Sequence, residues 1–104
     1  KLIFDTMAIH QPRKWDRRWR LLLFDIPETQ SRARRALSKK LATLGFYQCQ
    51  KSAWVHPFPC LEEVELIKNF YQIQPFVQLF IVDEMSDGKV MYYFRHDLKK
   101  VRSQ

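Results

Sequence analysis

The carboxylate with the strongest case for chemistry in this sequence is Asp25. It follows the apolar run Leu21 to Phe24, precedes Pro27, and has the strand parity of Leu21 and Leu23. An ionised carboxylate on an apolar strand face is costly unless it is paired or binds a metal. Two copies of Asp25 across a dimer axis could share one Mg²⁺ or Mn²⁺ through oxygen ligands. The alternative is structural, because Asp before Pro commonly accepts backbone N–H groups and opens the following turn.

A stripe of cations on a predicted helix is the second candidate site. Helical spacing over residues 31 to 44 stacks Leu37 and Leu41 on one face. Opposite that face lie Arg32, Arg35 and Lys39, with Arg34 and Lys40 on the flanks. Contact with phosphates would give affinity and salt dependence without reading sequence. The alternative is an ordinary solvated helix face.

The segment from Arg13 to Arg20, with sequence RKWDRRWR, interleaves two tryptophans with five cations. Arg17 and Arg18 are therefore further candidates for contact with nucleic acid, and Trp15 and Trp19 could stack on bases. The alternative is a hinge whose tryptophans pack on the domain. We favour packing, because Trp19 also begins a predicted core strand.

Length and composition narrow the class of protein. The chain has 104 residues, 46% of them hydrophobic, which predicts one folded domain. Two cysteines and three histidines show neither a disulfide framework nor zinc spacing, so a structural metal is not expected. No Ser, His and Asp set and no Gly-rich phosphate loop is visible, so an enzyme would have to be metal-dependent, and no cofactor other than Mg²⁺ or Mn²⁺ is expected. No apolar run approaches the roughly 20 residues of a bilayer span, so we expect a soluble, cytoplasmic protein without a membrane partner. The net charge of +7, concentrated in the first 44 residues, favours duplex nucleic acid as partner.

The hydrophobic periodicity predicts the order strand, helix, strand, strand, helix, strand. The predicted strands cover residues 19–26, 46–50, 52–56 and 76–82, and the predicted helices cover 31–44, 60–71 and a short 89–99. Gly45 stands where a helix commonly ends in a left-handed residue. This order predicts an α+β fold, a ferredoxin-like βαββαβ sandwich with an extra C-terminal helix, over residues 15–104. Residues 1–14 are expected to be a linker or the end of a preceding element.

The predicted sheet has apolar residues on both faces, although the two long helices can cover only one. The first strand carries Leu21 and Leu23 on one parity and Leu22 and Phe24 on the other. Something must cover the second face. We expect a second copy, giving a homodimer, or a segment of a longer chain.

Two stretches carry a family resemblance, WDRRWRLLLFDIPE and ARRALSKKLATLGFYQCQKSAWVHPFPC. Over about residues 14 to 83 the chain resembles the central domain of PaaX-type transcriptional regulators, the phenylacetic acid degradation repressor family. That domain in turn resembles the small CRISPR-associated nuclease Cas2. The shared series is a strand ending in Phe24 and Asp25, a basic helix, and a strand that begins near Gln50 and Ser52.

The resemblance implies a ferredoxin-like dimer and two different functions. In the nuclease family, the Asp at the position of Asp25 is the metal ligand, and in adaptation complexes with an integrase partner the dimer holds duplex DNA. In the regulator family, a winged-helix domain precedes this one, which mainly supports dimerisation. Trp15, Trp19, Trp54 and Pro57 favour the regulators. We therefore predict a dimerisation and DNA-associated domain of a PaaX-type regulator, with a Cas2-like metal-dependent nuclease or DNA-holding scaffold as the alternative.

Overall fold

A four-stranded antiparallel sheet organises the computed structural model, which describes residues 2 to 103. The strands are β2 (Trp19–Phe24), β3 (Tyr47–Gln50), β4 (Ala53–His56) and β5 (Val77–Val82), in the spatial order β3-β4-β2-β5. In chain order this is second, third, first, fourth, the strand order of a ferredoxin-like sheet. The predicted α+β ferredoxin-like fold is confirmed, and β2 is the central strand that its apolar residues on both parities indicated.

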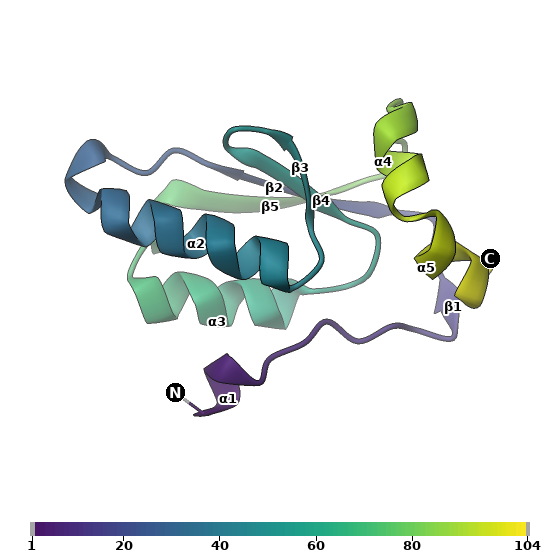
Figure 1. The fold of residues 1–104 in the computed structure, drawn as a ribbon, viewed down its shortest axis with the longest axis horizontal. Coiled ribbons are helices and arrows are strands. Elements are labelled where there is room, and N and C mark those ends of the chain that lie inside the picture. Colours follow the sequence, from purple (N-terminus) through teal and green to yellow (C-terminus); the bar gives the residue numbers. More distant parts are fainter. Residues whose placement is uncertain (1, 104) are drawn as a thin grey trace.

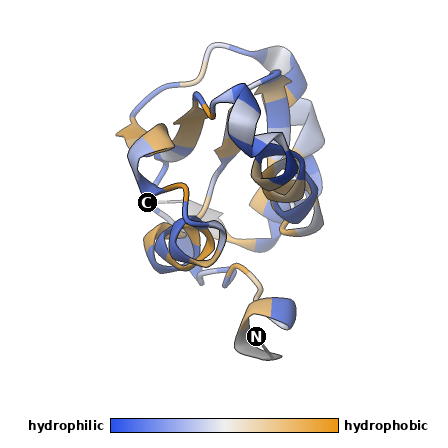
Figure 2. Ribbon diagram, turned by 90° about the vertical axis from the view of Figure 1, so that its left-hand side faces the viewer, coloured by the Kyte–Doolittle hydropathy of each residue, from blue (hydrophilic) through white to orange (hydrophobic). Residues whose placement is uncertain are grey.

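The two long helices, α2 (Ser31–Thr43) and α3 (Leu61–Tyr71), lie side by side on one face of the sheet (Figure 1). Their apolar stripes pack against alternate strand residues, and the resulting core includes Leu22, Phe24, Leu37, Leu41, Trp54, Val64, Ile67 and Val77. Figure 2 shows hydrophobic residues along the strands and mixed hydropathy around the helices. No helix within residues 2 to 103 is long and apolar enough to cross a membrane.

Most helices and strands begin and end close to the positions that the sequence predicted. Gly45 has a φ of +93° directly after α2, and the β3–β4 hairpin carries a bulge between Gln48 and Gln50. Strand β2 ends two residues before the predicted end, because its pairing with β5 stops at Phe24 opposite Val77. A short 3₁₀ helix, η1 (Glu28–Gln30), leads into α2, and a second, η2 (Gln74–Phe76), leads into β5.

The second face of the sheet is partly covered by the same chain. The helices α4 (Gly88–Tyr93) and α5 (Arg95–Lys100) form a second core with the sheet, which includes Trp15, Trp19, Val55, Phe58, Val90, Phe94 and Val101. The predicted C-terminal helix is confirmed, although it breaks at buried Phe94 into α4 and α5. The expectation that the cover must come from outside these residues was wrong for this part of the face.

The segment that precedes β2 contacts the rest of the domain near both of its ends. In the short helix α1 (Leu2–Asp5), the Phe4 ring stacks on Phe70 of α3 with 4.1 Å between centroids. The Nζ atom of Lys40 lies 4.5 Å from the centroid of the same ring and donates a hydrogen bond to the Phe4 carbonyl at 2.9 Å. Further on, β1 (Lys14–Trp15) pairs in parallel with β6 (Arg102–Ser103). Both contacts anchor this segment to the sheet domain.

His56 ends β4 and is buried between the two cores. Its Nδ1 atom accepts a hydrogen bond from the Phe58 N–H group at 3.1 Å, and its register partner on β2 is Arg20. Burial, together with the positive charge of Arg20, lowers the pKa of the His56 imidazole from 6.5 to about 4. The ring is therefore neutral at physiological pH and serves as a hydrogen-bond acceptor at the end of β4.

Acidification is expected to destabilise the fold through His56. In the unfolded chain an imidazole takes up a proton near pH 6.5, whereas the folded protein resists protonation down to about pH 4. The contribution of His56 to the free energy of unfolding is therefore complete above pH 6.5 and falls as the pH drops toward 4. The loss at about pH 4.5 should be on the order of 2.5 kcal/mol. Urea unfolding at neutral pH and at this pH measures it.

The matched control is His56→Asn, because an Asn side-chain oxygen can accept the same N–H hydrogen bond and does not titrate. The variant should lose less stability between the two pH values than the parent. Equal losses in both proteins would contradict the assignment to His56.

Candidate functional site

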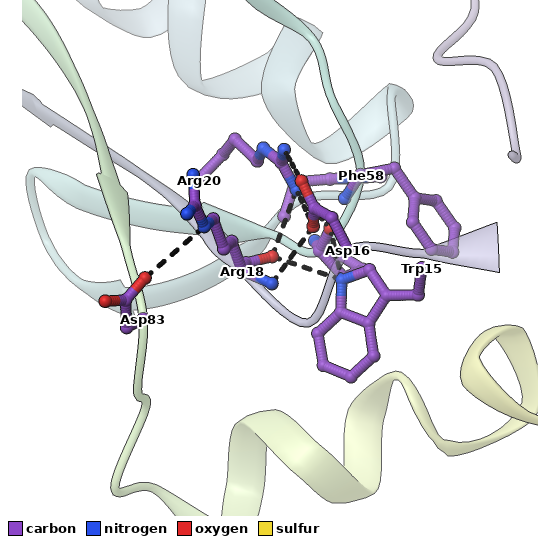
Figure 3. Close-up of polar contacts among 8 residues, drawn as sticks. Trp15, Asp16, Arg18, Arg20, Phe58 and Asp83 are labelled. Atoms are coloured by element: carbon purple, nitrogen blue, oxygen red, sulfur yellow. Dashed lines mark hydrogen bonds and ion pairs between the residues drawn. The ribbon is translucent and has the colours of Figure 1, made fainter. Parts of the chain in front are cut away.

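A buried guanidinium organises the turn between β1 and β2 (Figure 3). The two terminal nitrogens of Arg20 contact the two carboxylate oxygens of Asp16 at 3.0 and 2.5 Å. Arg20 also donates to the carbonyls of Arg18 at 3.0 Å and Pro57 at 2.8 Å. Hydrogen bonding from Arg20 holds the pKa of the Asp16 carboxyl below its ordinary value. Arg20 is one of the five cations of the segment from Arg13 to Arg20, but it has the strand parity of Leu22 and points to the helix-covered face.

The two tryptophans of this segment are packing residues. Trp15 and Trp19 are both buried, and their rings meet edge to face at 5.1 Å. The indole N–H of Trp15 donates to the Pro57 carbonyl at 2.7 Å and to the Arg18 carbonyl at 3.1 Å. The structure supports the packing interpretation over base stacking, because neither ring presents a face to solvent.

The cations of the same segment have different surroundings. Arg18 forms an ion pair with Asp83 at 3.4 Å, in which both side chains are largely exposed. Arg17 is exposed, and no polar contact of its side chain is present within residues 2 to 103. Arg17 therefore remains available to a partner, whereas Arg18 is shared with the loop that follows β5.

The predicted cationic stripe of α2 divides into free and engaged residues. Arg32, Arg35 and Lys39 are exposed, and their charged groups have no polar partner in the described part of the chain. Arg34 instead contacts the Ile26 carbonyl at 3.2 Å and the Glu28 carboxylate at 3.3 Å. Lys40 is held against α1 by its contacts with Phe4. The flanks of the stripe thus hold neighbouring segments in place.

Asp25 opens into a cleft of about 570 Å³ between the end of β2, α2 and the β3–β4 turn. The cleft is lined by Phe24, Asp25, Ile26, Glu28, Arg34, Arg35, Ser38, Gln48, Lys51 and Ser52. The carboxylate of Asp25 is exposed and accepts no hydrogen bond from any residue between 2 and 103. The structural alternative, in which Asp25 accepts backbone N–H groups, was wrong. The strand pairing ends at Phe24, and only the Asp25 backbone N–H is used, donating to the Phe76 carbonyl at 2.9 Å.

The β3–β4 turn contributes to this cleft, which the sequence did not indicate. The side-chain amide of Gln48 donates to the Lys51 carbonyl at 3.2 Å, which braces the turn. Lys51 and Ser52 then line the same cleft as Arg35, although sixteen residues separate Lys51 from Arg35 in the chain. Only the antiparallel register of the hairpin brings these residues to the end of β2, so no local signal could have identified them.

The cleft does not fit Mg²⁺ or Mn²⁺ with the residues of one chain. Its second carboxylate, Glu28, is engaged by Arg34, and two further cations, Arg35 and Lys51, line the cleft with Asp25. Within residues 2 to 103, no group of three or more His, Cys, Asp or Glu side chains could hold a metal ion. One free carboxylate beside two cations is a poor site for a hard divalent cation, which needs several oxygen ligands.

The fold and the site define a ferredoxin-like domain with a basic helix and a single strand-end aspartate. The family model described as the PaaX protein central Cas2-like domain matches residues 12–91. The chain therefore belongs to the PaaX central Cas2-like domain family, as the sequence motifs predicted. No curated protein and no solved structure matches the chain.

Asp25→Asn is expected to leave nucleic-acid cleavage unchanged, because the parent should show little or no metal-dependent nuclease activity. The measurement is cleavage of single- and double-stranded DNA and RNA with Mg²⁺ or Mn²⁺. Metal-dependent turnover that disappears in the nearly isosteric Asn variant would contradict this prediction. Such a result would place two Asp25 carboxylates on one ion.

Proposed function

We propose that this chain is the dimerisation and DNA-associated domain of a PaaX-type transcriptional regulator. The family match supports the class of protein. The observation that carries the proposal is the combination of an unpaired apolar strand edge with a free basic helix stripe in one small domain. The strand edge supports self-association, and the stripe supports contact with phosphates.

The two edges of the sheet differ in how they are protected. The β3 edge is only four residues long, contains a bulge and is contacted by α4 through the rings of Tyr47 and Tyr93 at 5.0 Å. The β5 edge is six residues long and its outer side has no strand partner among residues 2 to 103. Phe80 and Ile81 on β5 are 44% and 58% exposed, one on each face of the sheet. A long, flat, apolar edge is a template for pairing with another strand.

A second copy of this chain is the partner that best fits this edge. Two antiparallel β5 strands related by a two-fold axis would place each exposed Ile81 and Phe80 against the same surface of the other copy. Leu21 and Leu23, which are half-buried on the part of the second face that α4 and α5 do not cover, lie on the neighbouring strand β2 and would sit one strand away from this contact. An isologous contact of this kind removes apolar area from water on both copies.

Ile81→Lys is expected to convert a homodimer into a monomer. Sedimentation of the parent at micromolar concentration should give about twice the chain mass of 12.7 kDa, and the variant should sediment as a single chain. A lysine on an edge strand opposes pairing, and around a two-fold axis the two charges approach each other. The side chain is already exposed, so folding should be retained.

Tyr92→Lys on α4 is the matched control, since Tyr92 is 65% exposed and lies away from the β5 edge. It should remain a dimer. A parent that stays monomeric over a wide concentration range, or an Ile81→Lys protein that still dimerises, would contradict the proposed interface.

The stripe on α2 supports weak, sequence-tolerant binding to duplex DNA. Arg32, Arg35 and Lys39 form a row of cations with no internal partner in the described chain. Phosphate contacts of this kind position a protein on DNA and do not read bases. Recognition of an operator sequence would therefore come from another domain, such as the winged helix that the family resemblance implies.

Replacing Arg32, Arg35 and Lys39 together by Ala is expected to flatten the salt dependence of duplex binding. Each lost phosphate contact lowers the log–log slope by roughly 0.9, so the triple variant should lose about 2 to 3 in slope. Fluorescence anisotropy with a labelled duplex at several salt concentrations measures it.

The matched control replaces Lys89, Lys99 and Lys100, three exposed cations of α4 and α5, by Ala. It removes the same charge from a different surface and should change the slope by less. Equal slopes in both variants would assign the effect to net charge alone and would contradict a specific role for α2.

The DNA-holding scaffold remains the second candidate function. The cleft beside Asp25 favours it over a nuclease, because Arg35 and Lys51 line that cleft and could hold a phosphate without a metal ion.

A further inference from the structure

Arg17 has a backbone conformation that a long side chain rarely adopts. Its φ is +64°, in the left-handed region that favours glycine or asparagine. Within residues 2 to 103, Gln72 is the other non-glycine residue with positive φ, and it ends α3 as a left-handed cap. Gln72 is therefore explained by helix termination, a role that has no counterpart at Arg17.

The turn around Arg17 is held from both sides by the buried network. The Asp16 carboxylate accepts a hydrogen bond from the Arg18 backbone N–H at 3.0 Å. The Arg18 carbonyl accepts from the Trp15 indole and from the Arg20 guanidinium. Arg20 has a side chain only 5% exposed and is also bound to Asp16 (Figure 3). A strained backbone conformation persists when several surrounding contacts fix it. The hydrogen bonds of Asp16, Arg18 and Arg20 fix the conformation of Arg17 in this way.

Among residues 16 to 20, Arg17 is the cation whose side chain has no polar partner in the part of the chain that the structure describes. Arg18 is paired with Asp83, and Arg20 is committed to Asp16 and two carbonyls. Arg17 lines an open cleft of about 630 Å³, whose other charged residues are Asp16, Arg18, Asp83 and Glu84. Asp16 and Asp83 are neutralised by their partners, and Arg17 and Glu84 have no ion pair with any residue that the structure describes. Arg13 and Lys14, just before the turn, are exposed and unpaired among the described residues. The unpaired charged residues around this turn therefore carry a net positive charge.

We propose that Arg17 is a pre-positioned phosphate contact for duplex nucleic acid, on a surface separate from the α2 stripe. The inference rests on the proposed DNA association and adds a second point of contact to it. The turn lies just before β2, whereas the Asp25 cleft lies just after it, so the two surfaces are at opposite ends of the central strand (Figure 1). A planar guanidinium makes two parallel hydrogen bonds to a phosphate. A turn already fixed by buried contacts loses less freedom on binding than a mobile loop.

Arg17→Gly separates a binding role from a structural one. Glycine adopts the left-handed conformation without a side-chain penalty, so the melting temperature should stay the same or rise by up to about 5 °C. Duplex affinity at 0.1 M salt should fall about eightfold, and the log–log salt slope should fall by about 0.9. Arg17→Asn, which also tolerates positive φ, should behave in the same way. Lys99→Gln on α5 removes one exposed charge elsewhere and should change affinity less.

Gain or retention of stability together with weaker binding in Arg17→Gly supports the inference. Two results overturn it, namely unchanged affinity and slope in both variants, or a lower melting temperature that shows the side chain to be structural. If the α2 triple variant loses slope while Arg17→Gly does not, the inference fails and the proposed DNA association stands. If the parent binds no duplex, both fail. Binding of an acidic protein that depends on Arg17, without duplex binding, also overturns it.

Discussion

The buried guanidinium of Arg20 is the interaction on which the arrangement of this domain depends. It joins three parts of the chain: the turn at Asp16, the start of β2, and the Pro57 carbonyl that follows β4. An arginine that is almost fully buried is tolerable only when its donors are satisfied, and here a bidentate carboxylate and two carbonyls do so. Removing Asp16 would leave a buried charge without its counter-ion. The second core forms around the tryptophans that this network positions.

The basic character of the chain separates into two populations of cations with different roles. One population is engaged internally: Arg20 with Asp16, Arg34 with Glu28, and Lys40 with Phe4. The other has no polar partner among the described residues and includes Arg17, Arg32, Arg35, Lys39 and Lys51. Net charge alone does not distinguish the two populations. The distinction matters for binding, because a cation that is already paired or hydrogen-bonded must give up those contacts before it can neutralise a phosphate.

The partial cover of the second sheet face limits the surface that is available for the proposed self-association. Val90 and Phe94 bury the β3 and β4 side of that face together with Trp19. The β5 side is left with Phe80 on the face and Ile81 at the edge, both well exposed. On this face the C-terminal helices therefore leave Phe80 on β5 and the half-buried Leu21 and Leu23 on β2 uncovered. The proposed association accordingly involves the β5 edge and not the whole sheet face.

The sequence by itself determined the elements, their order and the ferredoxin-like class, because these follow from local periodicity. The Leu37 and Leu41 spacing specifies α2, the apolar run from Leu21 specifies a central strand, and Gly45 marks the end of the helix. Tertiary structure alone decided which charged residues remain free. The contacts that engage Lys40 and Trp15 join residues 36 and 42 positions apart, and Lys51 reaches the Asp25 cleft through strand register. A local pattern contains the period of a helix or strand, but not the partners that long-range packing brings to each side chain.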